Sequence, residues 1–222
     1  MDTMVISLGG SIIVPGEIDT KFLKRFREIV LTLETKRFLI ICGGGTICRK
    51  YQNVAAEIAP VPKADLDWIG IQATRLNAEL VRSMFGPMAY HKVIHDPDEP
   101  MDTDKRVIIG AGFEPGSSTD LRAVQLAQRF AAARVINMSN IDYVYSDDPK
   151  KNPDAEQATN ISWPDFRKLV GDEWDPGLNM PFDPIASRTA EAVGLKVVII
   201  GNDIRNLEKL LRDEPFRGTT IA

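Results

Sequence analysis

The stretch that decides the fold is FLIICGGGTICRKY, residues 38–51. An apolar run from Phe38 to Cys42 leads directly into three glycines, and the segment after them has helical spacing and carries Arg49 and Lys50. A strand, a glycine turn and a helix start form the arrangement in which backbone N–H groups face an anion. Glycines let the backbone approach a ligand that any Cβ would block, and a cation one helical turn later can reach the same anion. A tight turn without any ligand would explain an isolated GGG equally well.

Two further strands run into glycine turns. Residues 4–8 are apolar and precede Gly9-Gly10-Ser11, and residues 107–109 precede a loop that the glycines and proline of 110–116 predict to be flexible. This loop ends in Ser-Ser-Thr-Asp at 117–120, where a helix begins, and a helix N-cap accounts for only one of these four polar residues. Because the carboxyl ends of parallel strands meet at one edge of a sheet, we expect the three turns to gather there and to bind an anionic, phosphorylated ligand pair.

Strand and helix patterns alternate along the whole chain. This alternation predicts an α/β protein with a mainly parallel sheet that is covered by helices on both faces. The strands are predicted at 4–8, 38–42, 88–94, 106–109, 134–138 and 197–200, with a short edge strand at 218–221. The helices are predicted after Asp19 and at 47–58, 63–85, 121–130, 183–192 and 205–211, with a short helix near 164–169.

The predicted helix at 63–85 has an apolar and a polar face. Its apolar face carries Leu66, Ile69, Ala73, Leu76, Leu80 and Met84. Its polar face carries Asp67, Thr74, Arg75, Asn77 and Glu79. A polar row of this density is typical of a solvated helix face.

Composition excludes several classes of protein. The 222 residues suffice for one sizeable core, and the formal net charge of -4 argues against a general nucleic-acid binder. No run of 18 apolar residues predicts a membrane span, and no signal peptide begins at Met1, so we expect a cytoplasmic protein. The two cysteines, Cys42 and Cys48, are expected to be free thiols. The acidic loop at 96–104 contains several turn-forming residues and is typical of a solvated surface turn, so no metal site is predicted there.

Five motifs in register resemble the amino acid kinase family, and within it the archaeal-type uridylate kinases. They are GGS at 9–11, GGG at 43–45, IGIQATRLNAEL at 69–80, PGSSTD at 115–120 and DPKKNPDA at 148–155. The resemblance implies one three-layer α/β/α domain over residues 1–222, with an acceptor-binding part at about 1–120 and an ATP-binding part at about 121–222. It also implies transfer of the ATP γ-phosphoryl group to UMP in pyrimidine nucleotide synthesis, with Mg²⁺ as cofactor. The implied assembly is a homo-oligomer, a hexamer built from dimers.

The resemblance also assigns roles to matching residues. Those implied in catalysis are Gly10, Ser11, Asp120 and Arg188. Those implied to bind UMP are Gly44, Gly45, Arg49, Asp67, Thr74 and Thr119. Those implied to bind ATP are Gly9, Gly10, Asp142, Tyr145 and Asp148. No protein ligand of a metal ion is implied.

The chain departs from the family pattern at three positions where lysine is common. These positions hold Ser7, Thr46 and Arg188, and the turn at 110–112 is followed by the bulky Phe113 and the acidic Glu114. Arginine keeps the charge of lysine but presents it as a planar fork, so the change at 188 is not neutral. Two alternatives therefore stay open: a non-catalytic nucleotide- or oxyanion-binding relative, and a kinase of another small phosphate or carboxylate.

Overall fold

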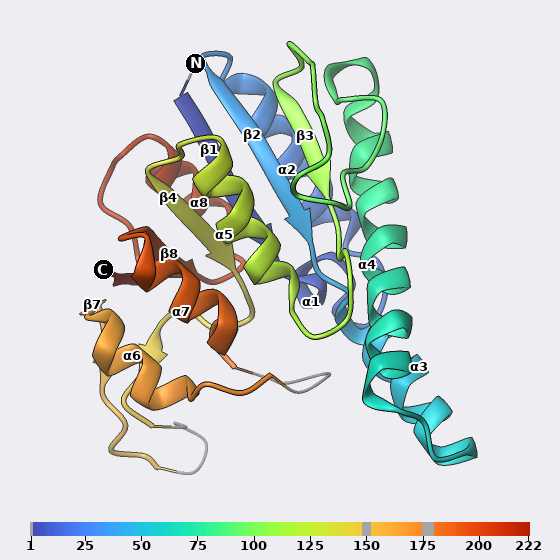
Figure 1. Ribbon diagram of the computed structural model, residues 1–222. Coiled ribbons are helices and arrows are strands. Elements are labelled where there is room, and N and C mark those ends of the chain that lie inside the picture. The colour runs from blue at the N-terminus through green and yellow to red at the C-terminus, as the bar shows by residue number, and fades with distance from the viewer. Residues whose placement is uncertain (1, 148–151, 175–179) are drawn as a thin grey trace.

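The structure, a computed structural model, describes residues 2–147, 152–174 and 180–222 (Figure 1). Its centre is a seven-stranded sheet in the order β3-β2-β1-β4-β8-β9-β7. These strands are β1 (Asp2–Leu8), β2 (Lys36–Cys42), β3 (Val107–Gly110), β4 (Arg134–Met138), β7 (Asn160–Ile161), β8 (Lys196–Ile200) and β9 (Thr219–Ile221). Strands β1, β2, β3, β4 and β8 are parallel to one another, β9 runs antiparallel to β8, and β7 runs parallel to β9. The predicted mainly parallel sheet is confirmed.

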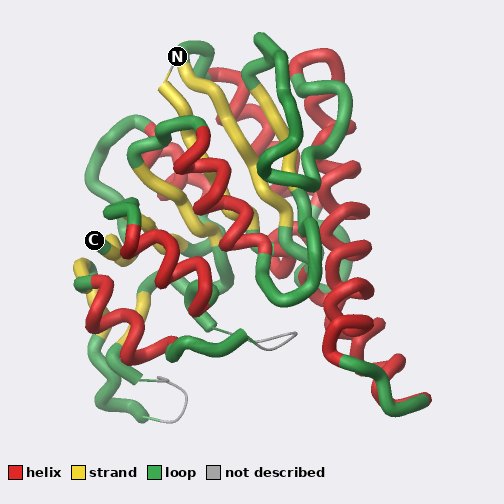
Figure 2. Tube along the Cα trace, in the orientation of Figure 1, coloured by secondary structure: helices red, strands yellow, loops and turns green. Residues whose placement is uncertain are grey.

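Helices cover both faces of this sheet, which confirms the predicted α/β/α sandwich (Figures 1 and 2). One face packs against α1 (Gly10–Ile13), α2 (Thr20–Thr32), α4 (Lys63–Phe85) and α8 (Ile204–Leu211). The other packs against α5 (Thr119–Arg129), α6 (Trp163–Val170) and α7 (Pro184–Ala192). Strand β1 illustrates the cause: Met4 and Ile6 belong to the first core and Val5 to the second, because successive side chains of a strand point to opposite faces.

Helix α3 (Gly45–Ile58) packs beside α4, and the pair projects beyond the sheet (Figure 1). Gln52 is the residue of α3 that is buried, and its side-chain amide donates to the Leu66 carbonyl at 2.8 Å. Gly70 allows this close approach, since a Cβ there would lie 3.1 Å from Gln52 Nε2. The apolar side chains Tyr51, Val54 and Ile58 of α3 are exposed.

A second, small sheet pairs β5 (Val144–Tyr145) with β6 (Gln157–Ala158) in antiparallel fashion. The backbone N–H of Val144 donates to Thr219 Oγ1 at 2.8 Å. This hydrogen bond ties the small sheet to β9.

Two of the predicted strands are wrong in detail. Residues 88–94 form no strand, because the chain first turns through a 3-10 helix, η1 (Gly86–Met88), and then meets β3 only through isolated bridges at Ala89 and Ile94. Strand β9 is not at the edge of the sheet, because β7 pairs with it on the outside. The two residues of β7 are too few to give a periodic signal.

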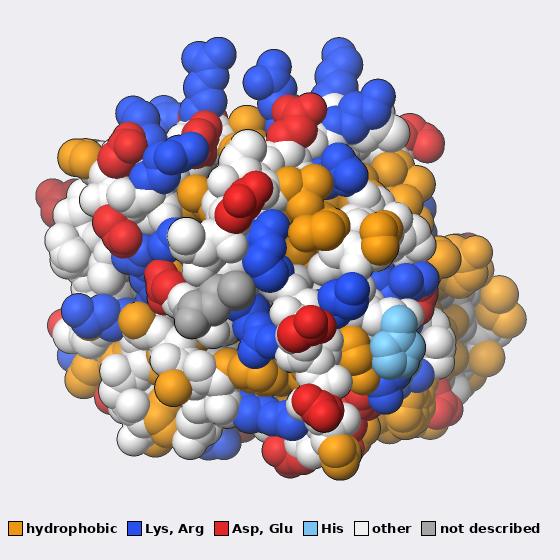
Figure 3. All heavy atoms as spheres, turned by 90° about the horizontal axis from the view of Figure 1, so that it is seen from above, with side chains coloured by type: hydrophobic (Ala, Val, Ile, Leu, Met, Phe, Trp, Pro, Cys, Tyr) orange, Lys and Arg blue, Asp and Glu red, His pale blue; other side chains and the backbone are white. Residues whose placement is uncertain are grey.

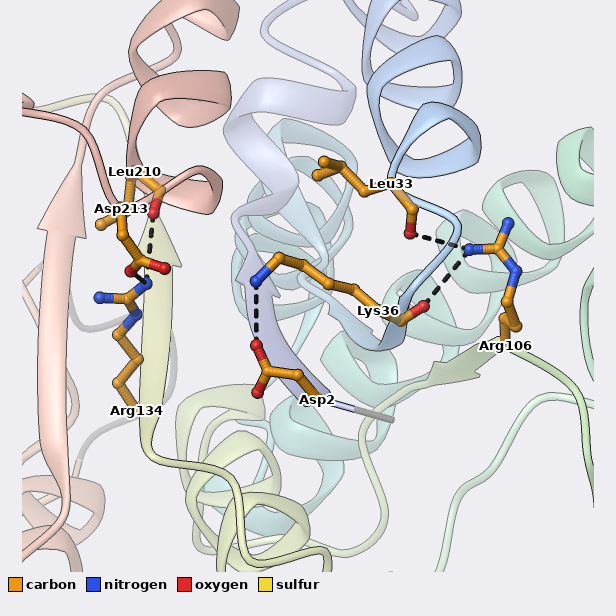
Figure 4. Close-up of polar contacts among 7 residues, drawn as sticks. All are labelled: Asp2, Leu33, Lys36, Arg106, Arg134, Leu210 and Asp213. Carbon is orange, nitrogen blue, oxygen red and sulfur yellow. Dashed lines mark hydrogen bonds and ion pairs between the residues drawn. The ribbon is translucent and has the colours of Figure 1, made fainter.

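The amino edge of the sheet carries many Lys and Arg side chains (Figure 3). Those drawn in Figure 4 have partners within the chain: Lys36 pairs with Asp2 at 2.9 Å, and Arg106 donates to the Leu33 carbonyl at 2.9 Å. Arg134 pairs with Asp213 at 2.5 Å. Arg106 and Arg134 thereby fix neighbouring loops to the sheet, and the Lys36 pair joins β1 to β2. Within the described ranges, no helix has both the length and the apolar character needed to cross a bilayer.

Candidate active site

The first two glycine turns touch each other at the carboxyl edge of the sheet. The Gly43 N–H donates to the Leu8 carbonyl and the Gly9 N–H to the Met138 carbonyl, both at 2.9 Å. A Cβ on Gly10 would lie 2.5 Å from the Gly43 carbonyl oxygen and would overlap the Gly45 nitrogen. The two backbones are thus too close for any side chain at Gly10, and the predicted convergence of these turns is confirmed.

Helix α4 connects the second turn to the third. Asn77 Nδ2 donates to the Gly43 carbonyl at 2.8 Å and to the Gly44 carbonyl at 3.2 Å. Thr74 Oγ1 accepts from the Gly112 N–H at 2.8 Å. Arg75 donates to the carbonyls of Gly112 and Phe113, both at 3.3 Å. One helix therefore aligns both turns.

The interpretation of the polar row of α4 as a solvated face is wrong. Asp67, Thr74 and Asn77 are all buried, whereas Leu76, assigned to the apolar face, is 63% exposed. The cause is that the glycine turns present backbone N–H and C=O groups to this helix, and buried polar groups of the backbone need partners. Polar side chains are favoured at a helix face that packs on bare backbone.

Asp67 joins α4 to two other segments. Its Oδ2 accepts from the Gly116 N–H at 2.8 Å and from Trp174 Nε1 at 3.4 Å. Gly116 has φ +91°, a conformation that favours glycine. Since a carboxylate has about four acceptor positions, Asp67 keeps capacity for further donors.

Asp120, at the start of α5, lies at the centre of a second polar network. Ser7 Oγ donates to its Oδ1 at 2.7 Å, and Asn137 Nδ2 donates to the same oxygen at 3.0 Å. The backbone N–H of Asp183 approaches its Oδ2 at 3.3 Å. These contacts place Asp120 between the carboxyl ends of β1 and β4 and the start of α7.

Burial raises the pKa of Asp120 to about 7. The hydrogen bond from Ser7 opposes this rise, and the neighbouring Asp183 carboxylate adds to it. Burial also raises the pKa of the neighbouring Asp183. Within the described part of the chain, Asp183 Oδ2 and Asn137 Oδ1 are buried without a hydrogen-bond partner.

The sequence profile of the Amino acid kinase family matches residues 2–201. The chain belongs to the amino acid kinase family. It is 34% identical to a uridylate kinase of Methanospirillum hungatei, over 100% of this chain and 95% of the relative. It is 32% identical to a uridylate kinase of Pyrococcus abyssi, over 98% of each chain.

Solved structures agree with this assignment. The crystal structure of a uridylate kinase from Archaeoglobus fulgidus is similar, with a TM-score of 0.84, 32% identity and full coverage of both chains. A UMP kinase structure from Bacillus anthracis has a TM-score of 0.76 at 20% identity, with 99% of this chain and 95% of that chain covered. The second likeness shows the fold alone.

The residues to which the resemblance assigned roles fall into two groups. The first group meets at the carboxyl edge and comprises Gly9, Gly10, Ser11, Gly44, Gly45, Asp67, Thr74, Thr119 and Asp120. The second group comprises Arg49 on α3, Asp142 before β5, Tyr145 in β5 and Arg188 on α7. Asp148 lies outside the described residues.

Members of the second group differ in what they contact. Asp142 lies against Gly201 at the end of β8, where a Cβ would collide with its carboxylate. Arg49 and Arg188 are exposed, and within the described ranges neither is bonded to Asp120. The pKa of Asp172 is lowered mainly by Arg167, with a smaller contribution from Arg188, so the guanidinium of Arg188 lies within electrostatic reach of Asp172.

Sequence reasoning missed two residues of the site, Asn137 and Asp183. Asn137 interrupts the apolar run 135–138 of β4, and a polar residue among buried strand positions was the available signal. Asp183 caps α7, accepting from the Ala186 N–H at 2.6 Å, and this cap role hides its second role beside Asp120. Among the described residues, no three His, Cys, Asp or Glu side chains form a group that could hold a metal ion by themselves.

We expect Asp120→Asn to change the pH dependence of folding stability. In the folded protein Asp120 keeps its proton up to about pH 7. In the unfolded chain the same carboxyl group has the ordinary pKa of 3.8 and loses its proton at a much lower pH. The folded state therefore binds more protons than the unfolded state between these values, and the contribution of Asp120 to stability falls as the pH rises through this window. Thermal unfolding of both proteins at pH 5 and pH 8 measures this. The stability of the variant relative to wild type should be higher at pH 8 than at pH 5. An equal stability difference between the two proteins at both pH values would contradict this prediction.

Proposed function

We propose that this amino acid kinase transfers the γ-phosphoryl group of ATP to UMP, giving ADP and UDP for pyrimidine nucleotide synthesis. The observation that carries the proposal is the contact between the turns at Gly10 and Gly43–Gly45. Two glycine turns in contact offer two adjacent backbone sites for anions, as transfer between two phosphates requires. The choice of UMP is supported by relatives named uridylate kinase that match over nearly the whole chain.

UMP, the acceptor, is proposed to bind to the first part of the chain, at about residues 1–120. Backbone N–H groups of Gly44 and Gly45, at the start of α3, would bind the UMP phosphate together with Arg49 one helical turn later. Asp67 would accept from the ribose hydroxyls. Thr119, the first residue of α5, would bind the same phosphate, and Thr74 would shape the pocket through its bond to Gly112.

ATP is proposed to bind across the first turn and the part at about residues 121–222. Gly9, Gly10 and Ser11 would hold its phosphates. Asp142 and Tyr145, with Asp148, would surround its adenosine. Both parts share one sheet, which supports a single domain.

Little covalent chemistry is left for the protein. The phosphate of UMP is already an anionic nucleophile at neutral pH, so the site needs position and charge neutralisation more than a strong base. Asp120, held by Ser7 and Asn137, would orient the groups around the transferring phosphoryl. Arg188, five residues after Asp183 on α7, is the candidate cation for the developing charge of the transferring phosphoryl group, with Arg49 on the acceptor side.

The residues beside Asp120 fit Mg²⁺. Carboxylate and amide oxygens are ligands that this ion accepts, and Asn137 Oδ1 and Asp183 Oδ2 are buried without hydrogen-bond partners in the described ranges. Together with the Asp120 carboxylate, these atoms would hold the ion, directly or through water. When bound with ATP, Mg²⁺ neutralises phosphate charge.

We also propose that α3 joins two copies of the chain. Tyr51, Val54 and Ile58 form one apolar stripe, and they are 68%, 53% and 79% exposed. A stripe this apolar on a surface helix indicates an interaction site. If two α3 helices pair antiparallel about Val54, Lys50 of each copy comes close to Glu57 of the other, and this self-complementary charge pattern favours a two-fold contact. The hexamer and the cytoplasmic location stay predictions.

Val54→Glu should separate the copies, because it puts a carboxylate at the centre of this stripe. Light scattering after size-exclusion chromatography should show the mass fall to that of a single chain. Gln72→Glu, an exposed change of the same charge on α4, should leave the mass of the oligomer unchanged. An oligomer that survives Val54→Glu would place the interface elsewhere.

The function is tested by ADP formation with Mg-ATP and a panel of UMP, CMP, AMP and small phosphate and carboxylate acids. Turnover with UMP about tenfold or more above CMP and the acids is expected. ATP binding without turnover on any acceptor would instead identify a non-catalytic relative. Preference for one of the acids would identify a kinase of another acceptor.

Arg49→Ala should raise the KM for UMP by about tenfold and leave that for ATP within about twofold, since it removes a charge-assisted contact to one substrate only. Arg25→Ala, an exposed arginine on α2, serves as the control. Initial rates with each substrate varied in turn give both constants. An equal rise for UMP and ATP would assign Arg49 a different role.

A further inference from the structure

The loop 112–118, between β3 and α5, is fixed at several points although its composition predicts flexibility. Helix α4 binds its start through Thr74 and Arg75 and its Gly116 N–H through Asp67. A further residue, Arg122 of α5, contacts the loop from its other side. The resemblance assigned no role to Arg122.

Arg122 is a charged side chain that is only 4% exposed. Its Nη2 donates to Ser117 Oγ at 2.7 Å, and its Nη1 donates to Gln125 Oε1 at 2.6 Å. The guanidinium carbon lies 5.4 Å from the centre of the Phe113 ring, within the range of a cation–π contact. Glu114 Oε1 is 3.8 Å away on a side chain that is 60% exposed, which makes this a weak ion pair.

One guanidinium thus contacts three residues of the loop from a single buried position. Burial of the charge lowers the pKa of Arg122, and Glu114 opposes this. Such burial is unfavourable unless the donors are used, and a planar fork can serve Ser117, Gln125 and the Phe113 ring together. A lysine would offer one point charge at the same place. The geometry therefore requires arginine.

We propose that Arg122 is a positioning residue that fixes the loop 112–118 against α5 and thereby sets the affinity for the acceptor. Ser117 is followed directly by Ser118, whose Oγ caps α5 by accepting from the Asp120 N–H at 3.1 Å, and then by Thr119. Holding Ser117 therefore holds the turn that carries Thr119 and Asp120. The acceptor part of this inference rests on the proposed function.

The expected consequence is a change in binding rather than in the chemical step. A loop with two glycines loses much conformational entropy when it is ordered. In the free protein Arg122 has already ordered it, so the acceptor binds a formed site. Without Arg122, acceptor binding must order the loop, and this weakens binding without altering the geometry once bound.

The first test needs no substrate. Backbone hydrogen exchange is measured by mass spectrometry on peptides covering 111–119 in wild type, Arg122→Lys and Arg122→Gln. Both variants should exchange about tenfold faster there, because a buried hydrogen bond to a charged group is lost. Unchanged exchange in both would overturn the proposal.

Arg129→Lys is the matched control. Arg129 lies two turns later on α5, stacks on Phe130 at 5.5 Å and donates to the carbonyls of Pro97 and Glu99. Its replacement should loosen residues 95–104 and leave 111–119 unchanged. Faster exchange at 111–119 in this control would show that any damage to α5 has the same effect, and would overturn a specific role for Arg122.

The second test measures dissociation constants for UMP and ATP and the kcat of the same proteins. Arg122→Lys should bind UMP about tenfold more weakly, with kcat within about threefold and ATP binding within about twofold. Ser117→Ala removes one hydrogen bond from the loop side and leaves the buried cation in place, so it should weaken UMP binding about threefold with little change in kcat or ATP binding. This variant also tests the proposal if the Arg122 variants do not fold. Equal weakening for both nucleotides, or a loss confined to kcat, would overturn the proposal.

The two tests separate this inference from the proposed function. If wild type neither binds nor phosphorylates UMP, the proposed function fails and the acceptor part of the inference fails with it. Loop exchange then still decides whether Arg122 fixes residues 112–118. If wild type phosphorylates UMP and the Arg122 variants bind it normally, the function stands and Arg122 has no positioning role.

Discussion

The close approach of Gly10 to Gly43 and Gly45 is the constraint on which the rest of this site depends. Parallel pairing of β1 with β2 brings the ends of both strands to one edge, but only glycine lets the following turns touch. The contact leaves peptide groups of two turns side by side. Side chains from elsewhere must then satisfy those groups that no ligand reaches, and this requirement shapes the helices around them.

Helix α4 shows the effect of that requirement most clearly. Asn77 and Thr74 bind the backbone of two different turns, and Asp67 binds the loop beyond them. These residues are buried because they pack on backbone, whereas Leu76 faces solvent. Hydrophobic periodicity assumes that buried surfaces are apolar, so it placed Leu76 on the buried face and missed the burial of Thr74 and Asn77. A polar row beside glycine-rich turns is better interpreted as a backbone-binding face.

The sequence predicted the strands β1, β2, β3, β4 and β8, because buried parallel strands are apolar runs. It also predicted that the turns after β1, β2 and β3 converge, because parallel strands end at the same edge of a sheet. It could not predict β7, whose two residues depend on pairing with β9. Nor could it predict that residues 88–94 meet β3 through two isolated bridges instead of forming a strand. Ser7 and Asn137 were visible as polar residues within apolar strands. That both side chains bind Asp120 depends on tertiary contacts that no local pattern encodes.

The charges of the site follow from the same packing. Asp67, Asp120 and Asp183 place three carboxylates at the carboxyl edge, while Arg122 is turned toward its loop and Arg49 and Arg188 are exposed. A bare nucleotide phosphate would be repelled by ionised Asp120 and Asp183, and the raised pKa of both shows that their ionisation is already unfavourable. Under the proposed function, a nucleotide that arrives with a divalent cation would remove this repulsion and would supply a partner for the buried oxygens of Asn137 and Asp183. If the proposed function holds, these carboxylates would favour the metal–nucleotide complex over the free nucleotide.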